Sequence, residues 1–265
     1  MNWKNGTVKM NNTEMDYLSF GRGEKVLLMI PGLGDGLKTV KGMAIPFSLL
    51  YRKLGASYRV YSFSRCRVLK EGMTTRDMAE DLYQAARILE IEKAHVLGVS
   101  LGGMIVQHLA ADHPDFVEKL VLTVTTDKIE EEFCRGLYLW MDQAEAGDYA
   151  GIMKDTAERS YSEKYLKLTR HMYGLLNYVG KPKDFSRFLI QARACLDHDS
   201  RPVLSKISCP VLVLGGQRDL ILGPQASRRL AEGIADVQLH MYEEYGHGAY
   251  EEAKDFQDRV LNFLK

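Results

Sequence analysis

Apolar residues recur along the chain in two alternating patterns. Short, nearly continuous apolar runs occupy residues 25–30, 94–99 and 209–216, as is typical of strands that are buried on both faces of a sheet. Residues 74–89 and 101–112 instead place apolar side chains three or four positions apart, which is the spacing of one face of a helix. This alternation of strand and helix predicts an α/β fold with a parallel, doubly wound sheet.

Shorter signals complete the predicted core. Further strands are expected at 7–10, 14–20, 58–63, 120–124 and 237–242, and further helices at 224–234 and 249–264. The turn residues Asn11, Asn12 and 21–23 separate the first strands, so the chain is expected to begin with an antiparallel pair. Thr74 and Asp77 have the spacing of a capping box, which predicts a helix start at this point.

The alternation stops between residues 127 and 205, where the patterns are helical. Four helices are expected in this stretch, at 133–144, 149–159, 164–176 and 184–196. Gly147 and residues 180–182 punctuate them. We therefore predict a core made of residues 1–126 and 206–265 and a helical segment, residues 127–205, inserted into it.

Composition and charge narrow the class of function. Lys plus Arg and Asp plus Glu both number 35, so no bulk charge favours nucleic acid or an anionic membrane. The apolar runs are too short to cross a bilayer, and the N-terminus lacks the apolar run of a signal peptide. No Cys/His cluster suggests a metal site. The sequence predicts a cytoplasmic protein with reduced thiols, no cofactor and a small-molecule substrate.

One motif carries a candidate nucleophile. Residues 98–103 read Gly-Val-Ser-Leu-Gly-Gly, a G-x-S-x-G motif between a predicted strand and a predicted helix. Such a sharp turn holds Ser100 in a strained conformation, and small residues at Gly98 and Gly102 let the chain pass closely. The serine hydroxyl is then exposed at a helix N-terminus, which favours developing negative charge. Taken alone, the motif also fits a structural turn with a capping serine.

A base and an acid follow the serine in the order that this topology requires. Asp219 comes just after the predicted strand 209–216, and His247 lies between the next strand and the last helix. Both are therefore expected on neighbouring loops at the carboxyl ends of the strands. Asp127 also follows a strand and is an alternative acid. The remaining histidines are expected to be structural or solvated: His95, His108, His113, His171, His198 and His240.

Two backbone amides are candidate donors for an oxyanion. The glycine-rich stretch 30–36 follows a predicted strand, and the N–H of Leu33 is expected to face that of Leu101 across the site. This stretch has neither a phosphate-loop pattern nor a dinucleotide-binding pattern. With Ser100 as nucleophile, His247 as base and Asp219 as orienting acid, the sequence predicts a serine hydrolase.

The chain resembles the α/β-hydrolase superfamily over nearly its whole length. The segments that carry the resemblance are 31–34, 78–82, 98–103, 215–219 and 246–247. The resemblance implies a mostly parallel eight-stranded sheet with helices on both faces and a helical cap inserted after the sixth strand. It is similar to small capped esterases, acyl-ester and C–C bond hydrolases, and cofactor-free perhydrolases.

The sequence departs from that family at two loops. Pro31 stands where many relatives have histidine, and residues 63–72 lack the Asp-x-x-Gly-x-Gly-type loop that many relatives carry at the rim of the site. The nucleophile is serine rather than aspartate, which argues against a haloalkane dehalogenase or epoxide hydrolase mechanism. Arg65, Arg67 and Arg193 are expected to be solvated, with contact to a substrate carboxylate as the alternative.

The predicted reaction is hydrolysis of a small carboxylic ester or thioester through an acyl-enzyme. The alternatives are C–C bond hydrolysis, perhydrolysis or acyl transfer by the same triad, a slow-turnover ligand-binding receptor, and a scaffold with a vestigial site. Activity is expected to fall in mild acid, because a protonated histidine cannot act as base. Aromatic residues of the inserted segment are expected mainly to pack it onto the core, and some to line a pocket: Tyr138, Trp140, Tyr149, Tyr161, Tyr165, Tyr173, Tyr178, Phe185 and Phe188.

Overall fold

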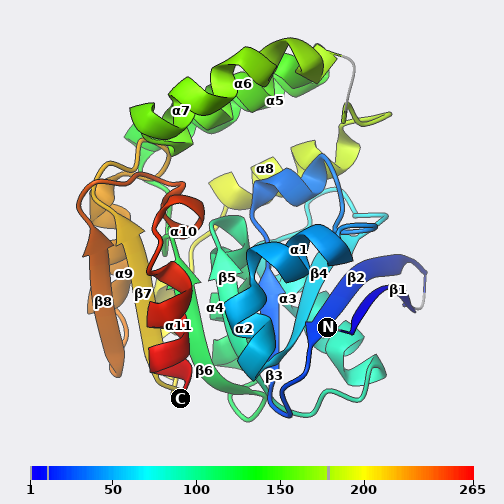
Figure 1. The fold of residues 1–265 in the computed structure, drawn as a ribbon, viewed down its shortest axis with the longest axis vertical. Helices are drawn as coiled ribbons and strands as arrows, with labels where there is room; N and C mark the ends of the chain where they lie inside the picture. The colour runs from blue at the N-terminus through cyan, green and yellow to red at the C-terminus, as the bar shows by residue number, and fades with distance from the viewer. Residues whose placement is uncertain (1, 11, 178–179) are drawn as a thin grey trace.

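The computed structural model describes residues 2–10, 12–177 and 180–265 and is built around one eight-stranded sheet (Figure 1). The strands are β1 (Trp3–Lys9), β2 (Glu14–Gly21), β3 (Val26–Ile30), β4 (Arg59–Cys66), β5 (Ala94–Val99), β6 (Val117–Thr123), β7 (Val211–Gly216) and β8 (Val237–Tyr242). Their spatial order is β1-β2-β4-β3-β5-β6-β7-β8. β2 pairs antiparallel with β1 and β4, and the later pairs are parallel. The mostly parallel sheet with an antiparallel start is therefore confirmed.

Helices cover both faces of this sheet. The core helices are α1 (Ala44–Leu50), α2 (Arg52–Ser57), α3 (Thr75–Ile88), α4 (Leu101–Asp112), α9 (Pro224–Glu232), α10 (Ala249–Glu252) and α11 (Phe256–Leu264), with a short 3-10 helix, η1 (Leu33–Gly36). Successive strand residues point to opposite faces, so Leu28 and Val96 join one buried cluster while Leu27 and Leu97 join the other. The second cluster includes Leu54 of α2.

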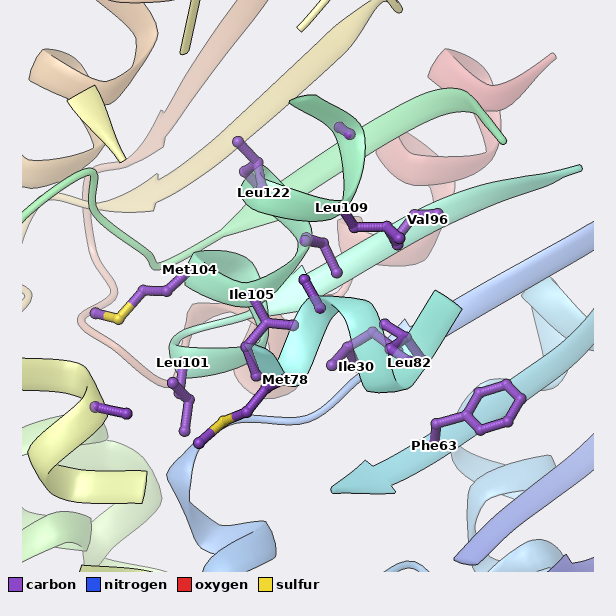
Figure 2. Close-up of a cluster of buried hydrophobic side chains, with 14 of the residues drawn as sticks. Ile30, Phe63, Met78, Leu82, Val96, Leu101, Met104, Ile105, Leu109 and Leu122 are labelled. Atoms are coloured by element: carbon purple, nitrogen blue, oxygen red, sulfur yellow. The ribbon is translucent and has the colours of Figure 1, made fainter. Parts of the chain in front are cut away.

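The cluster beneath α3 and α4 fixes the position of the site. Figure 2 shows Met78 and Leu82 of α3 beside Ile105 and Leu109 of α4, packed against Val96 of β5. Every residue of α4 except the last is buried. Because α4 is held on all sides, the turn that leads into its first residue is rigidly placed.

The chain between β6 and β7 is rich in helix, as the sequence pattern predicts. The inserted helices are α5 (Glu131–Glu145), α6 (Tyr149–Ser160), α7 (Glu163–Thr169) and α8 (Ser186–Leu196), with the 3-10 helices η2 (Arg170–Asn177) and η3 (Arg201–Lys206). In Figure 1, α5, α6 and α7 form a layer beyond the strand ends, on the side of the sheet at which β6 terminates. The two ends of this segment meet. The backbones of Lys128 and Asp199 form an isolated antiparallel β-bridge, and the N–H of Ser200 donates to the carbonyl of Asp127 (2.9 Å).

Two predicted helices differ from the structure, and two observed helices were not predicted. The predicted helix at 249–264 is two helices, because Ala253 adopts an extended conformation (φ −74°, ψ 115°) that ends α10. The predicted helix at 164–176 changes to a 3-10 helix at Arg170. The helices α1 and α2 were not predicted, because Pro46 and Gly55 interrupt their apolar pattern.

The described residues contain no disulfide, no metal-binding cluster and no membrane-spanning helix. All four cysteines are free thiols. Within 2–10, 12–177 and 180–265, no three His, Cys, Asp or Glu side chains are grouped so that they could hold a metal ion. None of the helices in this part of the chain has the length and apolar character of a membrane span.

Candidate active site

Ser100 occupies a strained turn between β5 and α4. Its backbone angles are φ 53° and ψ −121°, a region that non-glycine residues rarely adopt. The neighbouring glycines permit this close approach. A Cβ on Gly98 would lie 2.6 Å from the carbonyl oxygen of Gly102, and one on Gly102 would lie 2.0 Å from that of Ile30. The structure thus has the sharp strand-to-helix turn that the motif predicts, with the serine at its apex.

His247 and Asp219 form a buried pair. His247 Nδ1 lies 2.8 Å from Asp219 Oδ2, and Oδ1 of the same carboxylate accepts hydrogen bonds from the N–H groups of Ile221 (2.8 Å) and Leu222 (3.0 Å). An ionised carboxylate only accepts hydrogen bonds, so Nδ1 of a neutral His247 carries the hydrogen. Nε2 is then left with a lone pair that can take a proton.

Ser100 and His247 line the same cavity, which has a volume of about 440 Å³. This size suits a small molecule. Most of its wall is apolar, with contributions from Phe47, Leu50, Phe133, Leu137, Trp140 and Leu222. Among the described residues, no hydrogen bond connects Ser100 with His247. The two side chains are related because both line the same cavity. Such bonds often form fully only once substrate is bound.

The two predicted oxyanion donors both start helices. Leu33 is the first residue of η1 and Leu101 the first of α4, so neither N–H has a partner within its own helix. Leu33 lines the cavity. A Cβ on Gly32 would lie 3.2 Å from Cβ of Ser100, which places this loop directly against the serine. Leu33 and Leu101 therefore both begin helices close to Ser100, and their role as oxyanion donors stays a prediction.

Asp127, the alternative acid, has other partners. Its Oδ1 accepts hydrogen bonds from Arg229 Nε (3.0 Å), the N–H of Lys128 (2.9 Å) and the Thr126 hydroxyl (3.2 Å). These contacts fix the start of the inserted segment. The carboxylate that contacts His247 is that of Asp219.

Three other histidines are buried away from this pair. The His108 and His198 rings meet edge to face at 5.4 Å, and Nδ1 of His198 lies 2.9 Å from the Thr75 hydroxyl. Burial, together with nearby His108, lowers the pKa of His198 to about 3. Burial also lowers the pKa of His95. These histidines pack within the core, as the sequence predicts.

The prediction that Arg65 is solvated is wrong. Its side chain is only 4% exposed, and Nη2 donates to the carbonyl oxygens of Pro31 (2.6 Å) and Gly32 (2.9 Å). Arg67 is partly exposed and Arg193 is exposed. No local pattern marks Arg65 as buried, because its partners lie more than 30 positions earlier in the chain.

Aromatic residues of the inserted helices divide between the cavity and packing. Trp140 lines the cavity, and its Nε1 donates to Asp155 Oδ2 (2.7 Å). Tyr161 also lines it and is hydrogen-bonded to Glu251 (2.5 Å). Phe188 is buried in the core cluster instead. Tyr178 lies outside the described residues.

Comparison with known proteins agrees with the fold. A family model described as "alpha/beta hydrolase fold" matches residues 25–254. This chain belongs to that family. Among solved structures, MGS-M2, an alpha/beta hydrolase enzyme from a Medee basin deep-sea metagenome library, has the same fold, with a TM-score of 0.86 at 18% identity over 98% of this chain and 97% of that one.

Two curated relatives carry more specific names. The putative carbamate hydrolase RutD of Rhizobium rhizogenes is 28% identical over 202 residues, which cover 71% of this chain and 73% of that protein. A 2-hydroxy-6-oxononadienedioate/2-hydroxy-6-oxononatrienedioate hydrolase of Pseudomonas sp is 26% identical over 284 residues, which cover 98% of this chain and 92% of that protein. Both relatives are named as hydrolases.

Proposed function

We propose that this chain is a serine hydrolase that cleaves a small carboxylic ester or thioester through an acyl-enzyme on Ser100. Two observations carry this proposal: the buried contact between Asp219 and His247, and the presence of His247 and Ser100 in the wall of one largely apolar cavity. A serine needs an adjacent base to act as a nucleophile, and the free Nε2 of His247 supplies one on the cavity wall. The relatives named as hydrolases support the same class of reaction.

The reaction has two halves. His247 Nε2 takes the proton of the Ser100 hydroxyl while Oγ attacks the carbonyl carbon, and the N–H groups of Leu33 and Leu101 hold the resulting oxyanion. The imidazolium, stabilised by Asp219, gives its proton to the leaving alcohol or thiol as the C–O or C–S bond breaks. Water then loses a proton to His247 and attacks the acyl-enzyme. Release of the acid returns the proton to Ser100.

In this proposal residues 127–205 act as a cap over the core, residues 1–126 and 206–265, and select the substrate. Helix α5 contributes Phe133, Leu137 and Trp140 to the cavity wall. The catalytic groups come from the core, so the size and shape of the accepted acyl or alcohol group depend on side chains that take no part in the chemistry.

Hydrolysis of a C–C bond is a second candidate for the same triad. The Pseudomonas relative, which covers almost all of this chain, is named for a substrate with a 6-oxo group. A hydrolysis at such a ketone breaks the bond between the carbonyl carbon and its carbon neighbour. Product analysis separates the candidates, since an ester yields an acid and an alcohol whereas a ketone yields an acid and a new C–H bond.

Labelling with a fluorophosphonate tests the proposal. Wild-type protein should be labelled and should hydrolyse p-nitrophenyl esters, and Ser100→Ala should abolish both while melting at a similar temperature. Ser160→Ala is the matched control, because Ser160 lines the same cavity without a histidine partner, and it should keep the labelling. Folded wild-type protein that is neither labelled nor active on esters or ketones would overturn the proposal.

A further inference from the structure

A buried arginine lies directly behind the loop that carries Leu33. Nη2 of Arg65 donates to the carbonyl oxygens of both Pro31 and Gly32. This nitrogen has two hydrogens, so each carbonyl can receive one. Arg65 does not line the cavity that contains Ser100, and it therefore acts on the loop and not on a bound molecule.

The bond to Gly32 sets the direction of the next amide. The carbonyl of Gly32 and the N–H of Leu33 belong to one peptide unit, and the described residues contain no cis peptide bond. In a trans peptide the C=O and the N–H point in opposite directions. The Gly32 oxygen also accepts from the N–H of Asp35 (3.2 Å), and the guanidinium is its shorter partner (2.9 Å). A guanidinium that holds this oxygen therefore directs the Leu33 N–H away from Arg65, and Leu33 lines the cavity with Ser100. The same charge polarises the peptide and strengthens its N–H as a donor.

Asp35 and Arg187 hold Arg65 in place. Asp35 Oδ2 accepts hydrogen bonds from the backbone N–H of Arg65 (3.0 Å) and from Arg187 Nη2 (2.9 Å). Arg187, on α8, also donates to the carbonyls of Asp35 (2.8 Å) and Arg65 (3.2 Å). Asp35 is 3% exposed, so this charged group sits wholly inside the protein, between the inserted helices and the core.

The cluster of Arg65, Asp35 and Arg187 leaves several buried polar atoms without hydrogen bonds. Among the described residues, Nε and Nη1 of Arg65 and Oδ1 of Asp35 are buried without a hydrogen-bond partner. Buried polar atoms without hydrogen bonds lower stability, and replacing a buried ion pair by apolar residues of similar volume is often neutral or stabilising. The arrangement is therefore better explained by what Arg65 does to the Pro31–Leu33 backbone than by a gain in stability.

We propose that Arg65 is a positioning residue that aims and polarises the Leu33 amide through the Gly32 carbonyl. This inference rests on the proposed acyl chemistry of Ser100, in which that amide holds the oxyanion. An amide set in advance acts on the transition state more than on the bound substrate. Arg65 should therefore affect kcat and leave KM nearly unchanged.

Kinetics of three variants test the consequence. Arg65→Met should lower kcat on a p-nitrophenyl ester about 10–100-fold, less than or similar to the loss of a whole oxyanion donor, with KM within about twofold. The affinity for an arylboronic acid, which forms a tetrahedral adduct on serine, should fall in parallel. Arg65→Lys should recover part of kcat, because its ammonium can hold one carbonyl. Arg67→Met, the matched control, removes a cation two residues further along the chain that contacts Glu14 and Asp16 instead of the Pro31–Leu33 backbone, and it should lower kcat less than about threefold.

Amide NMR of the free protein tests the geometry independently of activity. The ¹⁵N–¹H signal of Leu33 should move in Arg65→Met and stay near its wild-type position in Arg67→Met. A Leu33 signal that does not move in Arg65→Met, or equal kcat losses in the Arg65→Met and Arg67→Met variants, would overturn the inference alone. Wild-type protein that shows no labelling and no turnover would overturn the proposed function, and the catalytic part of this inference with it.

Discussion

Asp219 Oδ2 lies 2.8 Å from His247 Nδ1, and the other oxygen of the same carboxylate is held by two amides of its own loop. The carboxylate cannot rotate without breaking these bonds. It therefore fixes both the tilt of the imidazole ring and the nitrogen that carries the hydrogen. This division of the two oxygens distinguishes Asp219 from a surface ion pair and makes its removal informative.

Asp219→Asn should lower kcat about 10³–10⁴-fold, because an amide favours the wrong histidine tautomer. The melting temperature should change little, since the Asn oxygen can still accept from Ile221 and Leu222. Steady-state kinetics with a p-nitrophenyl ester and thermal melts measure both. Asp127→Asn is the control: it weakens the contact with Arg229, so the melting temperature should fall while kcat at 25 °C stays within about threefold. Similar losses of kcat in the two variants would contradict the assignment of Asp219.

Gly102→Ala should prevent assembly of the turn at Ser100. The added Cβ would lie 2.0 Å from the carbonyl oxygen of Ile30, which is backbone and cannot swing away. Gly136→Ala is the matched control, because nothing lies within 4 Å of its Cβ and it is inside helix α5. Removing a helical glycine should raise stability by about 0.5–1 kcal/mol. Thermal melts that show Gly102→Ala as stable as Gly136→Ala would contradict the close packing of the turn.

Leu137→Ala should extend the range of accepted substrates toward longer chains. Leu137 is 6% exposed and lines the cavity, whereas Leu139 on the same helix is 39% exposed and lies outside the lining. The ratio of kcat/KM for hexanoyl and butyryl p-nitrophenyl esters should rise in Leu137→Ala and stay at the wild-type value in Leu139→Ala. An unchanged ratio in both variants would argue against a role of α5 in substrate selection.

Stability should fall as the pH drops below about 6.5. The folded-state pKa of His198 is about 3, below its ordinary value of 6.5, because the ring is buried and lies near His108. The unfolded chain binds a proton near pH 6.5 that the folded chain does not, so each such histidine lowers stability by up to about 1.4 kcal/mol per pH unit. Asp199 opposes this shift in the pKa of His198, and burial also lowers the pKa of His108.

Urea melts between about pH 7.5 and 4.5 measure this dependence. His198→Asn should flatten it, because the variant keeps an acceptor for the Thr75 hydroxyl and removes the titrating ring. His171→Asn, at an exposed position, should leave the dependence as it is in the wild type. A His198→Asn profile as steep as the wild-type profile would show that other groups dominate.

The fold could be predicted where local patterns and burial agree. Thr74 and Asp77 form the expected capping box, and β5 and β7 are buried at every position, as their apolar runs predict. The break between α10 and α11 could not be predicted, because apolar residues continue at helical spacing across it. Helix α1 was missed because Pro46 interrupts its apolar pattern and because the exposed Leu49 and Leu50 obscure its buried face.

The candidate site likewise contains residues that could be picked out from the sequence and one that could not. Ser100, Asp219 and His247 could be picked out because motif, chain order and strand ends each constrain them locally. Arg65 could not, because its burial depends on contacts with residues 31, 32 and 35, far away in the chain. A charged side chain is usually exposed, and only the three-dimensional arrangement shows that this one, near the end of β4, is buried against the backbone of Pro31 and Gly32.

The meeting of the two ends of the inserted helices has a consequence for how such a protein can change during evolution. The backbones of Lys128 and Asp199 form an isolated β-bridge, and β6 and β7, which flank the segment, are paired neighbours in the sheet. The chain thus leaves the sheet and returns to it at adjacent points, and the cost of closing such an excursion grows only slowly with its length. Helices can therefore be gained or lost between β6 and β7 without disturbing the pairing of these strands or the turn that holds Ser100.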